Sequence, residues 1–540
     1  MEKNEQLYYG GTILTVDKAC PTAEAVALKE GIIVNVGSYA SCRETLGASP
    51  ELFDLKGSVM LPGFIDTHLH PPLMIIFELN LNLLKINSVE KLQILLSNEA
   101  AGDETEQWLL GLQFDKQVLQ SVKQPVRQFL DGVCPNQPVV LITRDGHSVL
   151  ANSKAMEVAG ITKSTLEPDG GEIERLPSGE PSGIFRETAL PLLMGAMPMP
   201  PLESILSGGI RVFDRIASTG ITSAGMILQT DSEGVAGDQG AYDMALMEML
   251  LAHIPINLYS LLVTKDISKI GDWQKSALNQ PAGSLGRSIG GVKFWADGTF
   301  SSCTAFMEQP FSDFPDRRGF LIHTPKEMYE RMVKAHQAGM QIAIHSIGDA
   351  STRVCLDLFK QLLNEFPKPD CRHRLEHASQ LSAELIAEVA RLKLVVSTQP
   401  LFIHSEKGFL PKRLGLDRIK WTYPFRSLLD AGIVVAGASD SPIEEVNVLQ
   451  AIGCCVDREG FETQQAITTE EAIRMFTLDA AYAQFEESIK GSISTGKRAD
   501  LVILDQNPLT VSPEQIQNIQ IEKTICGGKI IYDDHHKRRD

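Results

Sequence analysis

The sequence has no long apolar run, no paired-cysteine motif and no excess of basic residues. No stretch approaches the roughly 18 apolar residues of a membrane-spanning helix. The first residues also lack the apolar segment of a secretory signal. The nine cysteines are odd in number and scattered without a C-x-x-C pair, which favours reduced thiols over a disulfide framework. We therefore expect a cytoplasmic protein with no membrane partner.

Acidic residues outnumber basic ones, 68 to 50, and the formal net charge is −18. A surface this acidic argues against nucleic acid and anionic membranes as partners. The hydrophobic content of 43% is ordinary for a globular protein. A chain of 540 residues exceeds what one hydrophobic core usually serves, so we expect two or more domains.

Strands and helices alternate through the middle of the chain. The apolar stretches that we interpret as strands are 61–68, 221–225, 256–263, 291–296, 341–345, 373–377, 394–399 and 433–438. Helical stretches such as PKEMYERMVKAHQAG separate most of them. Eight strands with intervening helices predict a (β/α)8 TIM barrel, an α/β fold, over 61–484.

Two further regions do not fit the barrel. Residues 1–60 and 485–540 read as short alternating strands with Gly-rich breaks, so we predict a β-sandwich domain built from both termini. About 150 residues separate the first two barrel strands, and loops of such length are usually structured or functional. We therefore predict an inserted subdomain at 75–205, directly after the first strand.

The first barrel strand ends in His68-x-His70, within LPGFIDTHLHPP. Residues i and i+2 of a strand point to the same face, so both imidazoles aim at one place. This arrangement suits a divalent metal ion. An isolated H-x-H pair is nevertheless more often a pair of ordinary histidines.

Other strand ends carry residues of the same kind. Strand 5 ends in His345, strand 6 in His377, and strand 8 in Asp440, whereas strands 2, 3 and 7 offer no His, Asp or Glu there. Singly, His345 reads as a strand-end histidine, His377 as a packing residue paired with Glu376, and Asp440 as a helix cap or Asx-turn. Chemistry in a barrel sits at the carboxyl ends of the strands, so their agreement favours a metal site.

Lys293 lies between apolar neighbours in strand 4. A cationic lysine would repel a metal, but burial lowers the pKa of a lysine and makes its amine nucleophilic. The amine can then add CO2 and lose a proton, and the resulting carboxylated lysine is an anion with two oxygens that can bridge two metals. The alternative is a lysine paired with Asp297.

The motifs PGFIDTHLHP, VKFWADG, IHSIGDA, LEHAS and ASDSP together resemble the amidohydrolase superfamily. Within it, the chain is most similar to the YtcJ-like branch, amidohydrolase family 3, which includes N-substituted formamide deformylase. The resemblance extends over nearly the whole chain. It implies a mono- or dinuclear metal site, most often zinc, whose ligands here are His68, His70, Lys293, His345, His377 and Asp440. All six positions hold the expected residue type.

The resemblance implies a metal-dependent hydrolase of a C–N bond, in an amide or N-formyl amide and not in a peptide. A metal lowers the pKa of bound water to give hydroxide, and Asp440 would accept and later deliver the proton. We expect His147, Trp295 and Asp297 to contact the small-molecule substrate, and the chain to form a homodimer. The alternatives are a cyclic-amide hydrolase or deaminase, and a catalytically dead binding scaffold.

Overall fold

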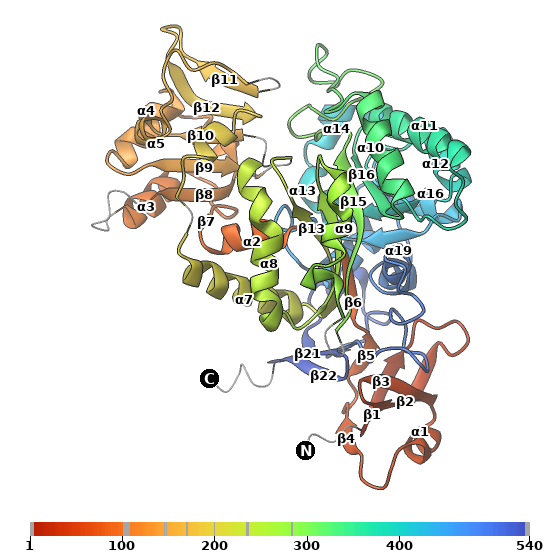
Figure 1. Cartoon of the computed structure of the whole chain (residues 1–540). Coiled ribbons are helices and arrows are strands. Elements are labelled where there is room, and N and C mark those ends of the chain that lie inside the picture. The colour runs from red at the N-terminus through yellow and green to blue at the C-terminus, as the bar shows by residue number, and fades with distance from the viewer. Residues whose placement is uncertain are drawn as a thin grey trace. The chain divides into compact units, whose positions relative to one another are not determined.

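The computed structural model describes residues 5–100, 108–144, 146, 148–168, 171–198, 200–233, 237–281 and 285–534. The chain divides into two compact units. The barrel unit comprises Met1–Pro71, Val212–Leu228 and Met244–Asp540, and the second unit comprises Pro72–Arg211 and Gln229–Asp243. Figure 1 shows the residues of both units, coloured along the chain from red at the N-terminus to blue at the C-terminus.

Eight parallel strands form a nearly closed barrel in the barrel unit. In sheet order they are β6 (Phe64–Leu69), β13 (Ile221–Gln229), β14 (Asn257–Val263), β15 (Arg287–Trp295), β16 (Gln341–Ser346), β17 (Arg374–His377), β18 (Val395–Thr398) and β19 (Val435–Gly437). Two backbone hydrogen bonds join the outer strands beyond their ends: Asp440 N donates to His68 O, and His70 N donates to Ser441 O, both at 2.8 Å. The predicted α/β barrel of eight strands is confirmed.

The first predicted strand, 61–68, is in fact two strands that meet at Gly63. Residues Val59–Pro62 form β5 in a different sheet, and β6 begins at Phe64. A Cβ at Gly63 would lie 2.3 Å from Thr222 Cγ2, so only glycine fits where the chain passes from one sheet to the other. A continuous apolar run hid this change of sheet.

Helices connect and cover the barrel strands, and α10 and α11 pack against β16 (Figure 1). The longer helices of the barrel unit are α8 (Asp243–Leu250), α10 (Pro325–Gln337), α11 (Asp349–Glu365), α12 (Ala383–Arg391), α17 (Val448–Asp457) and α18 (Thr469–Met475). The predicted helix in PKEMYERMVKAHQAG is α10. It begins with Pro325 in its first turn and a capping box between Thr324 and Glu327.

Strands from both ends of the chain form one hydrogen-bonded sheet of eight strands. Its strands are β1 (Glu5–Leu14), β2 (Thr22–Lys29), β3 (Ile32–Gly37), β4 (Glu51–Asp54), β5 (Val59–Pro62), β20 (Leu501–Leu504), β21 (Ile521–Cys526) and β22 (Lys529–Asp533). Tyr8, Met60 and Leu501 lie in one buried cluster of this sheet, so both ends share a core. Its description as a sandwich domain stays a prediction.

The second unit contains a six-stranded sheet in the order β11-β12-β10-β9-β8-β7. The strands are β7 (Leu81–Asn82), β8 (Leu109–Phe114), β9 (Val139–Thr143), β10 (Ser148–Ala151), β11 (Gly171–Arg175) and β12 (Pro181–Glu187), and the helices include α3 (Val89–Glu99), α4 (Val126–Val133) and α5 (Ser153–Val158). The predicted insertion, 75–205, falls within this unit, although its domain boundaries stay a prediction. Among the described residues, no helix combines the length and apolar character needed to cross a membrane.

Candidate metal centre

All six predicted metal ligands lie at or near the carboxyl ends of barrel strands. His68 is in β6 and His70 follows it, Lys293 is in β15, His345 in β16, His377 at the end of β17, and Asp440 three residues after β19. In a parallel barrel these ends form one face, so residues far apart in sequence meet there. Asp440 Oδ1 lies 3.3 Å from His68 Nε2 and 3.0 Å from His70 Nε2.

The four histidines form one cluster, in which His68 and His70 contact this carboxylate. The ring of His377 lies 5.2 Å from that of His68 and 4.4 Å from that of His345, measured between ring centroids. The rings of His68 and His70 are 5.3 Å apart. The structure therefore brings together the residues that the sequence singled out, and their role as ligands stays a prediction.

Two of these residues have an unusual backbone conformation. His377 has φ of 68° and Asp440 has φ of 60°, in the left-handed region that few non-glycine residues adopt. The positive φ of His377 interrupts the alternation of side chains between the two faces of the strand. The consecutive side chains of Glu376 and His377 can therefore both reach the cluster. Such local cost is common where a site requires a particular side-chain direction.

A buried aspartate, Asp66, holds two parts of the site together. Its carboxylate accepts hydrogen bonds from the backbone N–H of His68 at 3.0 Å and of Ser439 at 3.1 Å. It thus links β6 to the segment that carries Asp440. Burial raises the pKa of Asp66 to about 6. The sequence analysis did not identify this residue, although an aspartate inside an apolar strand was a signal.

The protonation states of the cluster suit a metal. Burial lowers the pKa of His68, His70 and His377, so these imidazoles are neutral at pH 7 and keep a lone pair for a cation. Burial by itself raises the pKa of Asp440, but the adjacent His68 and the hydrogen bond with His70 hold this pKa below the ordinary value. Three neutral imidazoles beside a carboxylate are a typical donor set for a divalent ion.

The geometry of the donors also fits a cation. One ligand atom each from His68, His70 and Asp440 lies within 4.8 Å of the others. Gln399 Oε1 accepts from His377 Nδ1 at 2.8 Å, which leaves the buried His377 Nε2 as a lone pair with no protein partner among the described residues. An unsatisfied buried nitrogen beside a carboxylate is what a missing ligand bond would leave.

Lys293 is buried and points into the cluster. Its Nζ lies 2.7 Å from His68 Nε2. Burial lowers its pKa to about 8, against the attraction of Asp440 and Glu376. The alternative pairing of Lys293 with Asp297 is wrong, because Lys293 Nζ contacts His68 Nε2 and, among the described residues, forms no ion pair with Asp297.

The three residues predicted to contact substrate differ in their surroundings. Asp297 accepts hydrogen bonds from four groups that lie between 2.7 and 3.0 Å: Phe306 N, Ile347 N, Gly348 N and Ser351 Oγ. Burial raises the pKa of Asp297 to about 7. Trp295 is half-buried, and its ring centroid lies 5.1 Å from Lys293 Nζ. His147 lies outside the described residues, and the substrate contacts of all three stay predictions.

The structure adds a pair that the sequence analysis missed, Arg374 and Glu376. Glu376 Oε2 lies 2.5 Å from His68 Nδ1, and Arg374 binds both oxygens of Glu376, at 2.6 and 2.9 Å. The suggested pairing of Glu376 with His377 is therefore wrong. The available signal was the i, i+2 spacing of two charged residues in a buried strand, since such residues share one face.

A second group, His336, Cys371 and His373, has ligand atoms equally close together but fits a metal poorly. Ile342 N–H donates to His373 Nδ1 at 3.0 Å, so Nε2 carries the proton and donates to His336 Nδ1 at 2.9 Å. His336 Nε2 in turn donates to Phe366 O at 2.8 Å. A metal on His373 Nε2 would require a proton on Nδ1, where the backbone N–H already points.

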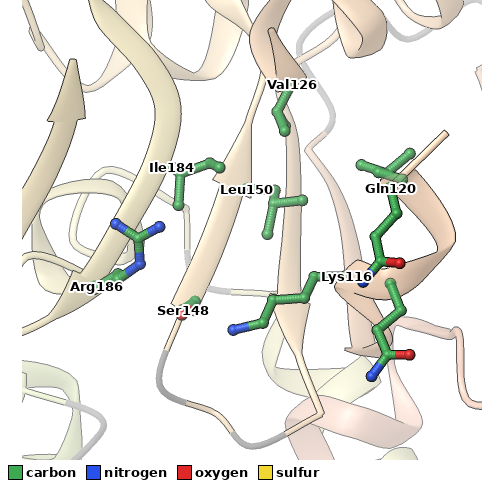
Figure 2. A pocket seen from close by; sticks show the side chains of 9 residues that line it. Lys116, Gln120, Val126, Ser148, Leu150, Ile184 and Arg186 are labelled. Atoms are coloured by element: carbon green, nitrogen blue, oxygen red, sulfur yellow. The ribbon is translucent and has the colours of Figure 1, made fainter. Parts of the chain in front are cut away.

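The second unit contains a hollow of about 400 Å³ (Figure 2). The side chains that line it include the apolar Val126, Leu150 and Ile184 and the cationic Lys116 and Arg186. Glu172 and Glu174 pair with the guanidinium of Arg186, at 2.9 and 2.7 Å. The charge of Arg186 is therefore already neutralised within this unit.

Comparison with known proteins places the chain in a family. The model of the amidohydrolase family matches residues 51–532, so the chain belongs to that family. YtcJ of Bacillus subtilis, named as an amidohydrolase, is 30% identical, and the match covers 98% of this chain and 99% of that protein. N-substituted formamide deformylase of Arthrobacter pascens is 26% identical over 98% of this chain and 99% of its own.

A solved structure supports the same assignment. An uncharacterized metal-dependent hydrolase from Pyrococcus horikoshii has a TM-score of 0.76 and 25% identity, covering 94% of this chain and 99% of that chain. The protein is therefore a hydrolase of the amidohydrolase superfamily. The family and the cluster of His68, His70 and Asp440 together support a divalent metal.

Proposed function

We propose that the protein hydrolyses a C–N bond in a small amide or N-formyl amide, and not in a peptide. The observation that carries this proposal is the convergence of His68 Nε2 and His70 Nε2 on one oxygen of Asp440, at 3.3 and 3.0 Å. These atoms come from opposite ends of the barrel sequence, and a purely structural aspartate would not require two imidazoles.

Asp440 is the proton carrier in this proposal. Its carboxylate is ionised at neutral pH, so it can accept a proton from water and later donate it to the departing nitrogen. A bound divalent metal would supply the polarisation of the scissile carbonyl and the activation of the attacking water. His377 acts as a ligand through Nε2, since its Nδ1–H is bound to Gln399.

The proposed ligand set is His68, His70, Lys293, His345, His377 and Asp440, with zinc as the metal. In this structure Lys293 Nζ stands 2.7 Å from the nitrogen with which His68 would bind a cation. A positive ammonium there would oppose metal binding, whereas a carboxylated lysine would bring two anionic oxygens to the same place. The lowered pKa of Lys293 increases the fraction of neutral amine, which is the form that carboxylation needs.

The relatives favour an amide substrate. One of them is named N-substituted formamide deformylase, which supports an N-formyl amide for this chain. A cyclic-amide hydrolase or a deaminase is the second candidate. His147, Trp295 and Asp297 are proposed to contact the substrate, and the cytoplasmic location and the homodimer remain parts of the proposal.

A substrate screen tests the function. Zinc-loaded protein should release amine from N-formyl or N-acyl amines, and Asp440→Asn should lose turnover by about 1,000-fold, because its amide cannot take up a proton. Circular dichroism should show an unchanged fold. Near-normal turnover by Asp440→Asn would exclude the proton role, and ammonia release from ring substrates alone would favour the deaminase.

A further inference from the structure

We infer that Arg374 and Glu376 are positioning residues that hold His68 in the orientation and tautomer required for metal binding. This inference rests on the proposed function, because it assumes a cation on His68 Nε2. Neither residue is among the proposed ligands.

The pair reaches His68 through the interior of the barrel. Arg374 and Glu376 lie two residues apart in β17, so both side chains point to the same side of the sheet. β17 is not a neighbour of β6 in the sheet order, and the contact with His68 therefore does not follow from strand pairing. All three side chains are fully buried.

The contact determines which nitrogen of His68 carries the proton. A carboxylate only accepts hydrogen bonds, so the 2.5 Å contact with Glu376 places the proton of His68 on Nδ1. The lone pair is then on Nε2, the nitrogen that faces Asp440. Without Glu376, the proton could occupy Nε2 instead and block the metal.

Arg374 fixes Glu376 and β6 together. Its Nε and Nη2 hold the two oxygens of Glu376 at 2.6 and 2.9 Å, an arrangement that leaves the carboxylate little freedom to rotate. Nη2 also donates to Thr67 O at 3.0 Å, directly before His68 in the chain. The pair thus restrains both the backbone and the ring of His68, and such partners of a metal-binding histidine typically contribute about 10- to 100-fold in affinity.

The competing explanation is that the pair only stabilises the barrel interior. The chain offers a control in Arg372 and Glu487, a less buried pair whose guanidinium and carboxylate lie 2.8 and 2.9 Å apart. Arg372 is only two residues from Arg374, but its pair does not contact His68. Removing the carboxylate from each pair separates a general loss of packing from a specific effect on the metal.

The test compares Glu376→Gln and Glu487→Gln in the full chain. We expect Glu376→Gln to raise the Kd for Zn²⁺, measured against a competing chelator, by about 10- to 100-fold, and to change the visible absorption of the Co²⁺-substituted protein. Glu487→Gln should leave both unchanged. Arg374→Lys keeps the charge but not the bidentate contact, so it should raise the Kd for Zn²⁺ by a smaller factor. This variant provides the test if Glu376→Gln does not fold.

A Zn²⁺ Kd within twofold of the wild-type value in folded Glu376→Gln would overturn the inference and leave the proposed function standing. If Glu376→Gln does not fold, a Zn²⁺ Kd within twofold of the wild-type value in Arg374→Lys would overturn the inference in the same way. A wild-type protein that binds neither Zn²⁺ nor Co²⁺ would overturn the proposed function, and this inference with it.

Discussion

Lys293 shows how much one side chain can determine about this site. It is buried, its pKa is lowered to about 8, and its Nζ is 2.7 Å from His68 Nε2. As an ammonium it would compete with a cation for that nitrogen, and as a carboxylated lysine it would help to bind one. The two forms lead to opposite expectations for substitutions.

For Lys293→Ala we expect a loss of activity of about 100-fold or more, because the carboxylated side chain no longer positions the metals. Short-chain carboxylates added to this variant should restore part of the activity by occupying the vacated space. Lys293→Arg should not respond, since its guanidinium keeps the positive charge and fills the gap. Turnover rates of both variants, measured with and without acetate or propionate, test this prediction. Full activity in Lys293→Arg would contradict a carboxylated lysine.

At the scale of elements, the barrel strands were predictable because buried parallel strands are continuous apolar runs. His68, His345 and His377 could be found at strand ends for the same reason. The pairing of Glu376 with His68 could not, because contacts across a barrel interior depend on stagger between strands that are not adjacent in sequence. The division of 61–68 at Gly63 could not be predicted, because the residues on both sides of it are apolar although they belong to two different sheets.

The segment between β16 and β17 yields a prediction about pH. Burial lowers the pKa of His373 to about 3, below its ordinary value near 6.5. Below pH 6.5, His373 binds a proton in the unfolded chain but stays neutral in the folded chain. The free energy of unfolding therefore falls as the pH drops from 6.5 towards 3. Between pH 6.5 and 5 this loss is about 1–2 kcal/mol at most.

His373→Asn removes this titration and retains an oxygen that can accept from Ile342 N. The melting temperature of the wild-type protein should therefore fall more between pH 6.5 and 5 than that of His373→Asn. Equal changes in both proteins would show that His373 is not buried in its neutral form.

At the scale of the whole molecule, the family and the barrel follow from the full length of the chain, since the family model matches 51–532. The second unit has its own six-stranded sheet and its own buried core around Leu141 and Phe114. The metal, in contrast, depends on residues of the barrel unit alone.

The metal content of the purified full chain tests the central claim most directly. Elemental analysis should find one or two equivalents of a divalent metal, most of it zinc, per chain. His68→Ala should lose most of this metal, whereas His373→Ala, from the group that fits a metal poorly, should retain it. A wild-type protein with less than about a tenth of an equivalent after reconstitution with Zn²⁺, or a His68→Ala variant that keeps its metal, would contradict the account.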